Sequence, residues 1–185
     1  GVTGWMVTGV VSLIVNWVAA YLLYRLGVAF LSQWPHTRLV QLGRFGGRLI
    51  YRLLPPRRKL ALKNIRAAFP EKTEQECRAI ARQSFETLGV VGCEFLCFRA
   101  MGNYFDEIVD YTDLDYIPAA HAEGKGVILF AGHFGSWEFL AQCCGHLNYP
   151  FTAIGRPLGN ALIYAHIQKV RRAIGIEVVD KLGVA

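Results

Sequence analysis

A stretch of 24 residues without a charged side chain, residues 1–24, restricts the fold of this chain more than any other feature. As a helix, residues 5–24 are about long enough to cross a bilayer hydrocarbon core of roughly 30 Å. The stretch also holds aromatic residues of the kind found at membrane interfaces, namely Trp5, Trp17, Tyr21 and Tyr24. The sequence therefore predicts an N-terminal transmembrane anchor in residues 1–34. A secretory signal peptide is the main alternative, and it fits less well because no basic segment precedes the apolar run.

The charges of the chain are unevenly distributed. Ten of the twenty basic residues and none of the fourteen acidic ones lie in residues 1–70, which leaves residues 71–185 with a net charge of −4. A one-sided basic segment suits nucleic acid or anionic lipid, and the neighbouring apolar stretch favours lipid. No nucleic-acid recognition motif accompanies the charge, so we expect no nucleic-acid partner. Basic residues directly after the apolar stretch predict that the chain which follows lies on the cytoplasmic side.

Residues 35–70 are predicted to form basic amphipathic helices at the membrane surface. Apolar residues repeat in steps of three and four from Leu39 to Leu53, and arginine occupies every fourth position at Arg44, Arg48 and Arg52. Pro55-Pro56 ends this first helix, and residues 58–69 predict a second. The arginine stripe suits anionic headgroups or an acidic carrier protein, and the sequence leaves both open.

The candidate site lies in residues 127–138, Val-Ile-Leu-Phe-Ala-Gly-His-Phe-Gly-Ser-Trp-Glu. The uninterrupted apolar run over residues 127–131 predicts a central strand buried on both faces. Ser136 is a suitable N-cap for the helix that follows. His133 would then lie at the carboxyl end of a strand, where open α/β sheets bind their ligands.

His133 and Glu138 are separated by four residues, and a turn followed by helix can bring the carboxylate to the imidazole. A carboxylate on one ring nitrogen makes the other a better base, so the pair can take a proton from a hydroxyl. The motif has no obvious Ser or Cys nucleophile, which favours direct attack of a substrate hydroxyl on an activated acyl group. The alternative is that His133 caps a loop and Glu138 faces water, because this spacing is common.

Three blocks of the sequence resemble one family. Gly-His-Phe-Gly-Ser-Trp-Glu after an apolar strand resembles the active-site block of the bacterial lipid A late acyltransferases, within the glycerolipid acyltransferase superfamily. Asn64-Ile-Arg-Ala-Ala-Phe-Pro70 is similar to a block upstream, and Arg156-Pro-Leu-Gly-Asn160 to one downstream. The resemblance implies that His133 is the general base and Glu138 its partner. It also implies that Arg156 binds the acceptor's phosphate, with a surface ion pair as the alternative.

The fold class that follows is α/β: a transmembrane helix and then the first part of an acyltransferase domain in residues 71–185. In the resembled family the domain continues beyond this point, so we expect an incomplete sheet. Thr73 and Glu76 predict a capping box that opens a long helix, in which Glu94 is assigned to the surface. The other expected strands are 109–111, 151–154 and 176–179, and the other expected helices are 116–123, 136–143 and 160–174.

The cysteines do not predict a metal site. Cys77, Cys93, Cys97, Cys143 and Cys144 form an odd set without Cys-x-x-Cys spacing or nearby histidines in zinc order. We therefore expect reduced core cysteines, no metal and no organic cofactor.

The resemblance implies an enzyme of the bacterial inner membrane. It would move a fatty acyl group from acyl carrier protein to a hydroxyl of a phosphorylated lipid A precursor. One alternative is a glycolipid or lysophospholipid acyltransferase with another acceptor. The other is an inactive, truncated, membrane-bound lipid-binding module. Acyl-chain length, acceptor position and oligomeric state are not predicted.

Overall fold

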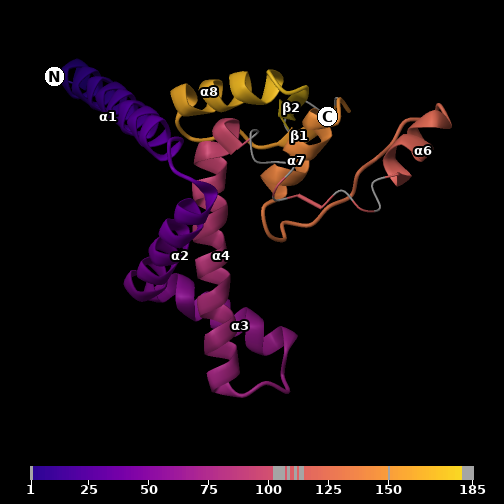
Figure 1. Ribbon diagram of the computed structural model, residues 1–185. Helices are drawn as coiled ribbons and strands as arrows, with labels where there is room; N and C mark the ends of the chain where they lie inside the picture. Colours follow the sequence, from indigo (N-terminus) through magenta and orange to yellow (C-terminus); the bar gives the residue numbers. More distant parts are fainter. Residues whose placement is uncertain are drawn as a thin grey trace.

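The computed structural model describes residues 2–101, 107, 109–110, 112, 115–149 and 151–180. Figure 1 shows β1, β2, α7 and α8 gathered at one end of the long helix α4, with α2 beside α4 and α3 at its other end. The elements are α1 (Val2–Leu31), α2 (His36–Leu53), α3 (Pro55–Ala68), α4 (Glu74–Met101), α6 (Tyr116–Ala122), α7 (Trp137–His146), β1 (Phe151–Gly155), α8 (Ala161–Arg172) and β2 (Ile176–Asp180).

Helix α1 confirms the predicted N-terminal apolar helix and extends beyond it to Leu31. Its segment Val11–Leu31 is long and apolar enough to cross a membrane, and none of it is buried inside the protein. A stripe of half-buried residues runs along it at Trp17, Tyr21, Tyr24 and Val28. Steps of four and three keep these residues on one face of a helix, and this face is the one that packs on the rest of the chain.

Helices α2 and α4 pack unusually closely. The buried face of α2 consists of Leu39, Gly43 and Gly47. A Cβ atom on Gly47 would lie 2.1 Å from the carbonyl oxygen of Phe85, so only glycine permits this approach. Because α4 takes this face, the leucine face that the sequence emphasised is left partly open, and Leu49 and Leu53 are exposed.

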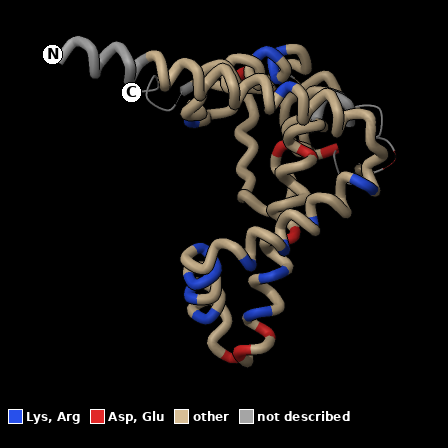
Figure 2. Tube along the Cα trace, turned by 90° about the vertical axis from the view of Figure 1, so that its left-hand side faces the viewer, with Lys and Arg blue, Asp and Glu red and all other residues tan. Residues whose placement is uncertain are grey.

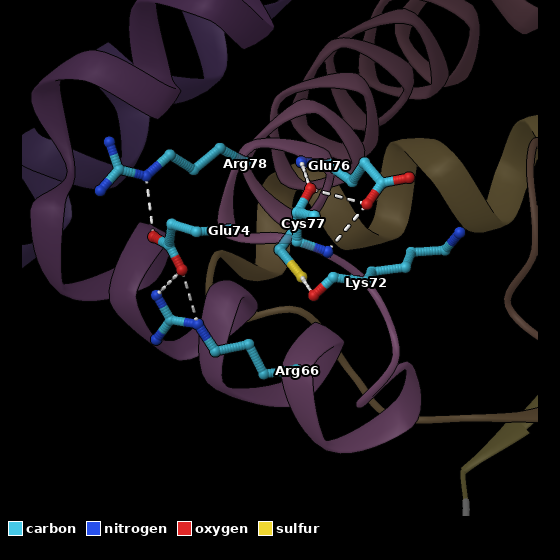
Figure 3. A network of polar contacts seen from close by, with 7 residues as sticks. Arg66, Lys72, Glu74, Glu76, Cys77 and Arg78 are labelled. Carbon is cyan, nitrogen blue, oxygen red and sulfur yellow. Dashed lines mark hydrogen bonds and ion pairs between the residues drawn. The ribbon is translucent and has the colours of Figure 1, made fainter.

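The turn between α3 and α4 is fixed by polar contacts (Figure 3). The predicted capping box is confirmed: the Thr73 backbone N donates to Glu76 Oε2 at 2.8 Å, and the Glu76 backbone N donates to Thr73 Oγ1 at 3.3 Å. Glu74 accepts hydrogen bonds from Arg66 and Arg78. Pro55 and Pro56 occupy the first positions of α3, where a missing backbone donor costs little.

The core where α1, α2, α4 and α7 meet is built on Leu39 and Cys97. Leu31 packs against it from the end of α1, Trp34 from the turn that follows, and Phe139 from α7. Glu94 lies in this region and not at the surface as predicted: its side chain is buried, and its Oε1 lies 3.1 Å from His36 Nε2. The sequence prediction was wrong because the histidine that satisfies the carboxylate is 58 residues away.

Strands β1 and β2 are parallel and are connected through α8. Their register pairs Phe151 with Ile176 and Gly155 with Asp180. Both strands and the helix between them were predicted, as was the capping residue of α8. Asn160 Oδ1 accepts from the backbone N atoms of Leu162 and Ile163, at 3.0 and 3.1 Å.

The predicted strand over residues 127–131 is not formed. This segment is irregular and lies open to solvent: Ile128 is 94% exposed, and Phe130 is fully exposed. A strand needs a neighbour for its backbone hydrogen bonds, and β1 and β2 form a sheet with two strands in the described part of the chain. The expected strand over residues 109–111 is also absent at Val109 and Asp110, and Tyr111 lies outside the described residues.

Candidate active site

His133 lies in the irregular segment between the open apolar run and α7. The Phe134 backbone N donates to the Gly132 carbonyl at 2.9 Å, and Gly135 has a φ of +62°, a conformation that favours glycine. Together these two features make the chain bend tightly at His133. The imidazole is exposed, and its ring centroid lies 5.0 Å from that of Trp137. The exposed imidazole is therefore accessible to a substrate.

Glu138 is the second residue of α7 and is only 3% exposed. Its Oε1 accepts from Arg171 Nε and its Oε2 from Arg171 Nη2, both at 2.8 Å. This is a bidentate guanidinium–carboxylate pair, the strong and geometrically specific kind. The Arg171 guanidinium also lies 5.8 Å from the centroid of the Phe95 ring. The pair thus joins α7 to the end of α8 and to α4.

Among the described contacts, no hydrogen bond joins His133 to Glu138, so their pairing stays a prediction. An ionised carboxylate offers about four acceptor positions, so the Arg171 pair leaves capacity for an imidazole. Ser136 stands before α7 as predicted, but its hydroxyl makes no capping hydrogen bond. That oxygen is buried and has no partner in the described part of the chain.

Arg156 directly follows β1, and its side chain is exposed. The alternative of a surface ion pair finds no support in the described residues, because none of their salt bridges involves Arg156. Its charge is thus available to an anionic ligand. Four residues later, the loop that contains Arg156 is attached to α1, because Asn160 Nδ2 donates to the Trp17 carbonyl at 3.0 Å.

Arg171 is the residue that the sequence prediction missed. It lies in the last turn of α8 among other basic residues, where a cation is expected to complement the helix dipole. That position gave no reason to single it out, and its partner Glu138 is 33 residues away. The only available signal was the absence of an acidic neighbour on α8 itself.

The cysteines near the site are poorly suited to act as nucleophiles. Burial raises the pKa of the Cys97 and Cys143 thiols to about 11, and it also raises the pKa of Cys93 and Cys144. At neutral pH such thiols are almost entirely protonated. Within the described ranges, no three or more His, Cys, Asp or Glu side chains group as a metal site would require.

The relatives described here are all named as acyltransferases. A lipid A biosynthesis lauroyltransferase of Escherichia coli (strain K12) is 29% identical over 144 residues, covering 75% of this chain and 45% of the relative. A lipid A biosynthesis palmitoleoyltransferase of the same strain is 28% identical over 142 residues, covering 76% and 46%. A phosphatidylinositol mannoside acyltransferase of Mycolicibacterium smegmatis is 27% identical over 77 residues, covering 42% and 25%.

The match to these relatives therefore spans less than half of their own length. No solved structure gives a significant match. The model of the family described as bacterial lipid A biosynthesis acyltransferase matches residues 11–184, which is nearly the whole chain. On that match, the chain belongs to the bacterial lipid A biosynthesis acyltransferase family.

Proposed function

We propose that this chain carries the catalytic base of an enzyme that transfers a fatty acyl group from acyl carrier protein to a hydroxyl of a phosphorylated lipid A precursor. The observation that carries the proposal is the buried Glu138, which Arg171 holds at the first turn of α7, shortly after the exposed His133 in the sequence. The pairing of His133 with Glu138 is itself part of the proposal. Family membership supplies the reaction class. The donor and the acceptor are part of the proposal.

In the proposed reaction, His133 takes the proton of the acceptor hydroxyl while the oxygen attacks the thioester carbonyl. The tetrahedral intermediate collapses to the new ester, the carbon–sulfur bond breaks, and the imidazolium returns its proton to the departing thiolate. Glu138 stabilises the imidazolium and orients the ring. Arg171 fixes the carboxylate, so it is a positioning residue.

Arg156 would bind the acceptor's phosphate. A guanidinium is permanently charged and matches phosphate with two parallel donors, and Arg156 has no described ion pair to break first. The phosphate contact would orient the acceptor so that its hydroxyl reaches His133. Binding of this kind raises the effective concentration of the hydroxyl at the base.

The basic half of the chain suits the two proposed partners. Lys and Arg gather at the end of the molecule formed by α2, α3 and the start of α4 (Figure 2). On α2, Phe45, Leu49 and Leu53 are exposed beside Arg52, which suits an anionic bilayer surface. Between the helices lies a pocket of about 530 Å³, which suits an acidic carrier protein. Its lining is Tyr51, Arg58, Lys59, Leu62, Arg66, Glu74 and Arg78.

We place the protein at the bacterial inner membrane, with its catalytic part on the cytoplasmic side. Support comes from α1, whose length and composition allow it to cross a membrane, and from the basic residues that follow it. A bilayer location also brings the site to a lipid acceptor without requiring the acceptor to leave the membrane.

A second candidate function is acyl transfer to another glycolipid. The similarity to a phosphatidylinositol mannoside acyltransferase favours it, because that relative acts on a glycolipid of a different kind. The two proposals differ only in the acceptor, so they share the roles of His133 and Glu138.

The test is acyl transfer by membranes that contain the protein, with radiolabelled acyl groups on acyl carrier protein or on coenzyme A. Acceptors would include a lipid A precursor with and without its sugar phosphates, and a phosphatidylinositol mannoside. The proposal expects transfer from the carrier protein to the phosphorylated precursor and a strong loss without the phosphates. Transfer to the phosphatidylinositol mannoside alone would overturn the lipid A acceptor and favour the second candidate.

A further inference from the structure

Helix α1 is not separated from the rest of the chain, because α8 packs along it. The hydroxyl of Tyr24 and Nδ1 of His166 are joined by a hydrogen bond of 3.1 Å. The rings of Tyr21 and Tyr24 also contact the His166 ring edge to face, with centroids 6.4 and 5.5 Å apart. The contact therefore begins well inside Val11–Leu31, the segment that could cross a membrane.

Asn160 marks the deepest point of this contact, and its side chain makes three hydrogen bonds within the protein. The amide nitrogen donates to the Trp17 carbonyl at 3.0 Å, and the amide oxygen accepts two backbone donors of α8. A polar group tolerates lipid only when its hydrogen bonds are made internally. Three of the four hydrogen-bonding positions of the Asn160 side chain are satisfied in this way.

The side chains around the contact are apolar and exposed. On α1, large apolar residues are exposed on the faces that α8 does not cover, namely Val11, Leu13, Ile14, Val15, Val18, Leu22, Leu23, Leu26 and Phe30. Beside the contact, Leu158 and Leu162 are also exposed, one in the loop before α8 and one in its first turn. Residues that lie beside the same part of α1 are at a similar depth in the bilayer. Lipid that covers Val18 and Leu22 therefore also reaches Leu158 and Leu162.

We propose that residues 157–162 form a second membrane contact beside α1, in which Leu158 and Leu162 insert among the lipid acyl chains. Arg156 precedes this segment, and its long side chain can extend toward the headgroup layer while its neighbours are immersed. In this respect the inference deepens the proposed function and rests on it: the acceptor's phosphate approaches Arg156 from within the bilayer. The membrane contact itself does not depend on catalysis.

The test places an environment-sensitive fluorophore on cysteines introduced as Leu158→Cys and Leu162→Cys, in intact protein reconstituted into phosphatidylethanolamine–phosphatidylglycerol vesicles. Leu23→Cys on α1 is the membrane reference. Tyr116→Cys is the solvent reference, because it is exposed on α6, on the far side of the molecule from α1 (Figure 1). The native thiols should label little at neutral pH, because Cys77 is buried and burial raises the pKa of the other four.

Nitroxide lipids, with the quencher near the headgroup or at mid-chain, then report depth. We expect both probes on residues 158 and 162 to lose emission, most strongly with the mid-chain quencher, while the probe on residue 116 keeps its emission. Emission at residues 158 and 162 that matches residue 116 would overturn the proposal, whether or not residue 23 is quenched. An acyl-transfer assay of the unlabelled protein separates this result from failure of the proposed function.

Discussion

The two ends of α4 are stabilised in different ways. We define the arm as α2, α3 and the first half of α4. Its helices touch through glycines. Four ion pairs lie at its surface, namely Arg48–Glu86, Arg82–Glu86, Arg66–Glu74 and Arg78–Glu74. At the site end, defined as α7, α8, β1 and β2, one buried pair joins Glu138 to Arg171. Exposed pairs contribute little one by one, whereas removing half of a buried pair is costly. Charge changes should therefore matter most at the site end.

Glu138→Gln should have the largest effect on stability. It leaves Arg171, whose side chain is 18% exposed, without its counter-charge. We expect a loss of about 3–5 kcal/mol in the free energy of unfolding, measured by urea denaturation. Replacing both partners, as Glu138→Gln with Arg171→Met, should recover part of that loss. Glu74→Gln at the exposed arm pair is the matched control and should leave the midpoint close to wild type. If Glu138→Gln is as stable as wild type, the claim that charge changes matter most at the site end is wrong.

Gly47→Ala should be the most damaging small change in the arm. Its Cβ would lie 2.1 Å from the Phe85 carbonyl oxygen, so α2 must move away from α4. We expect a loss of about 1–3 kcal/mol in unfolding free energy. Gly46→Ala on the same helix is the control, because its Cβ meets open space and helix propensity improves by up to about 1 kcal/mol. Equal behaviour of the two variants would mean that α2 and α4 are not in close contact.

Asn160→Ala should lower the unfolding free energy by about 1 kcal/mol, because α8 loses its N-cap. Asn160→Ser separates the two roles of this side chain: serine can cap the helix but is too short to reach the Trp17 carbonyl. Thermal unfolding in one detergent compares the three proteins. If serine loses as much as alanine, the stabilisation comes from the contact with α1 and not from the cap.

The smallest effect concerns acid pH. Hydrogen bonds from Arg66 and Arg48 lower the pKa of Glu74 and Glu86, respectively, below the usual value of 4.5. A lowered folded-state pKa gives stability that is fully present above the unfolded value and is lost as pH falls through the folded one. The melting temperature of wild type should therefore exceed that of a Glu74→Gln, Glu86→Gln variant at neutral pH, and the gap should close only below about 4.5. A gap that closes at higher pH would contradict this assignment.

Local patterns predicted most of the helices. The Thr73–Glu76 capping box and the Asn160 cap both occur as expected, because each depends on residues within one helical turn. Strands β1 and β2 and the helix between them were also predicted, because each has its own local sequence pattern. Their parallel pairing became visible only in the structure.

Contacts between distant residues were not predictable. Residues 127–131 have the composition of a buried strand, but composition cannot supply the neighbour whose backbone a strand requires. The burial of Glu94 and Glu138 depends on His36 and Arg171, which lie 58 and 33 residues away. The candidate site residues were identified from their motif, while the ion pair that positions Glu138 became visible only in the structure.

The most direct test of the proposed base is the rate of acyl transfer by membranes containing wild type or His133→Ala. His121→Ala changes an exposed histidine on α6 and serves as the control. With radiolabelled acyl carrier protein as donor and the phosphorylated lipid A precursor as acceptor, we expect His133→Ala to lose at least roughly a hundredfold in rate. His121→Ala should match wild type. Equal rates for wild type and His133→Ala would show that His133 is not the base.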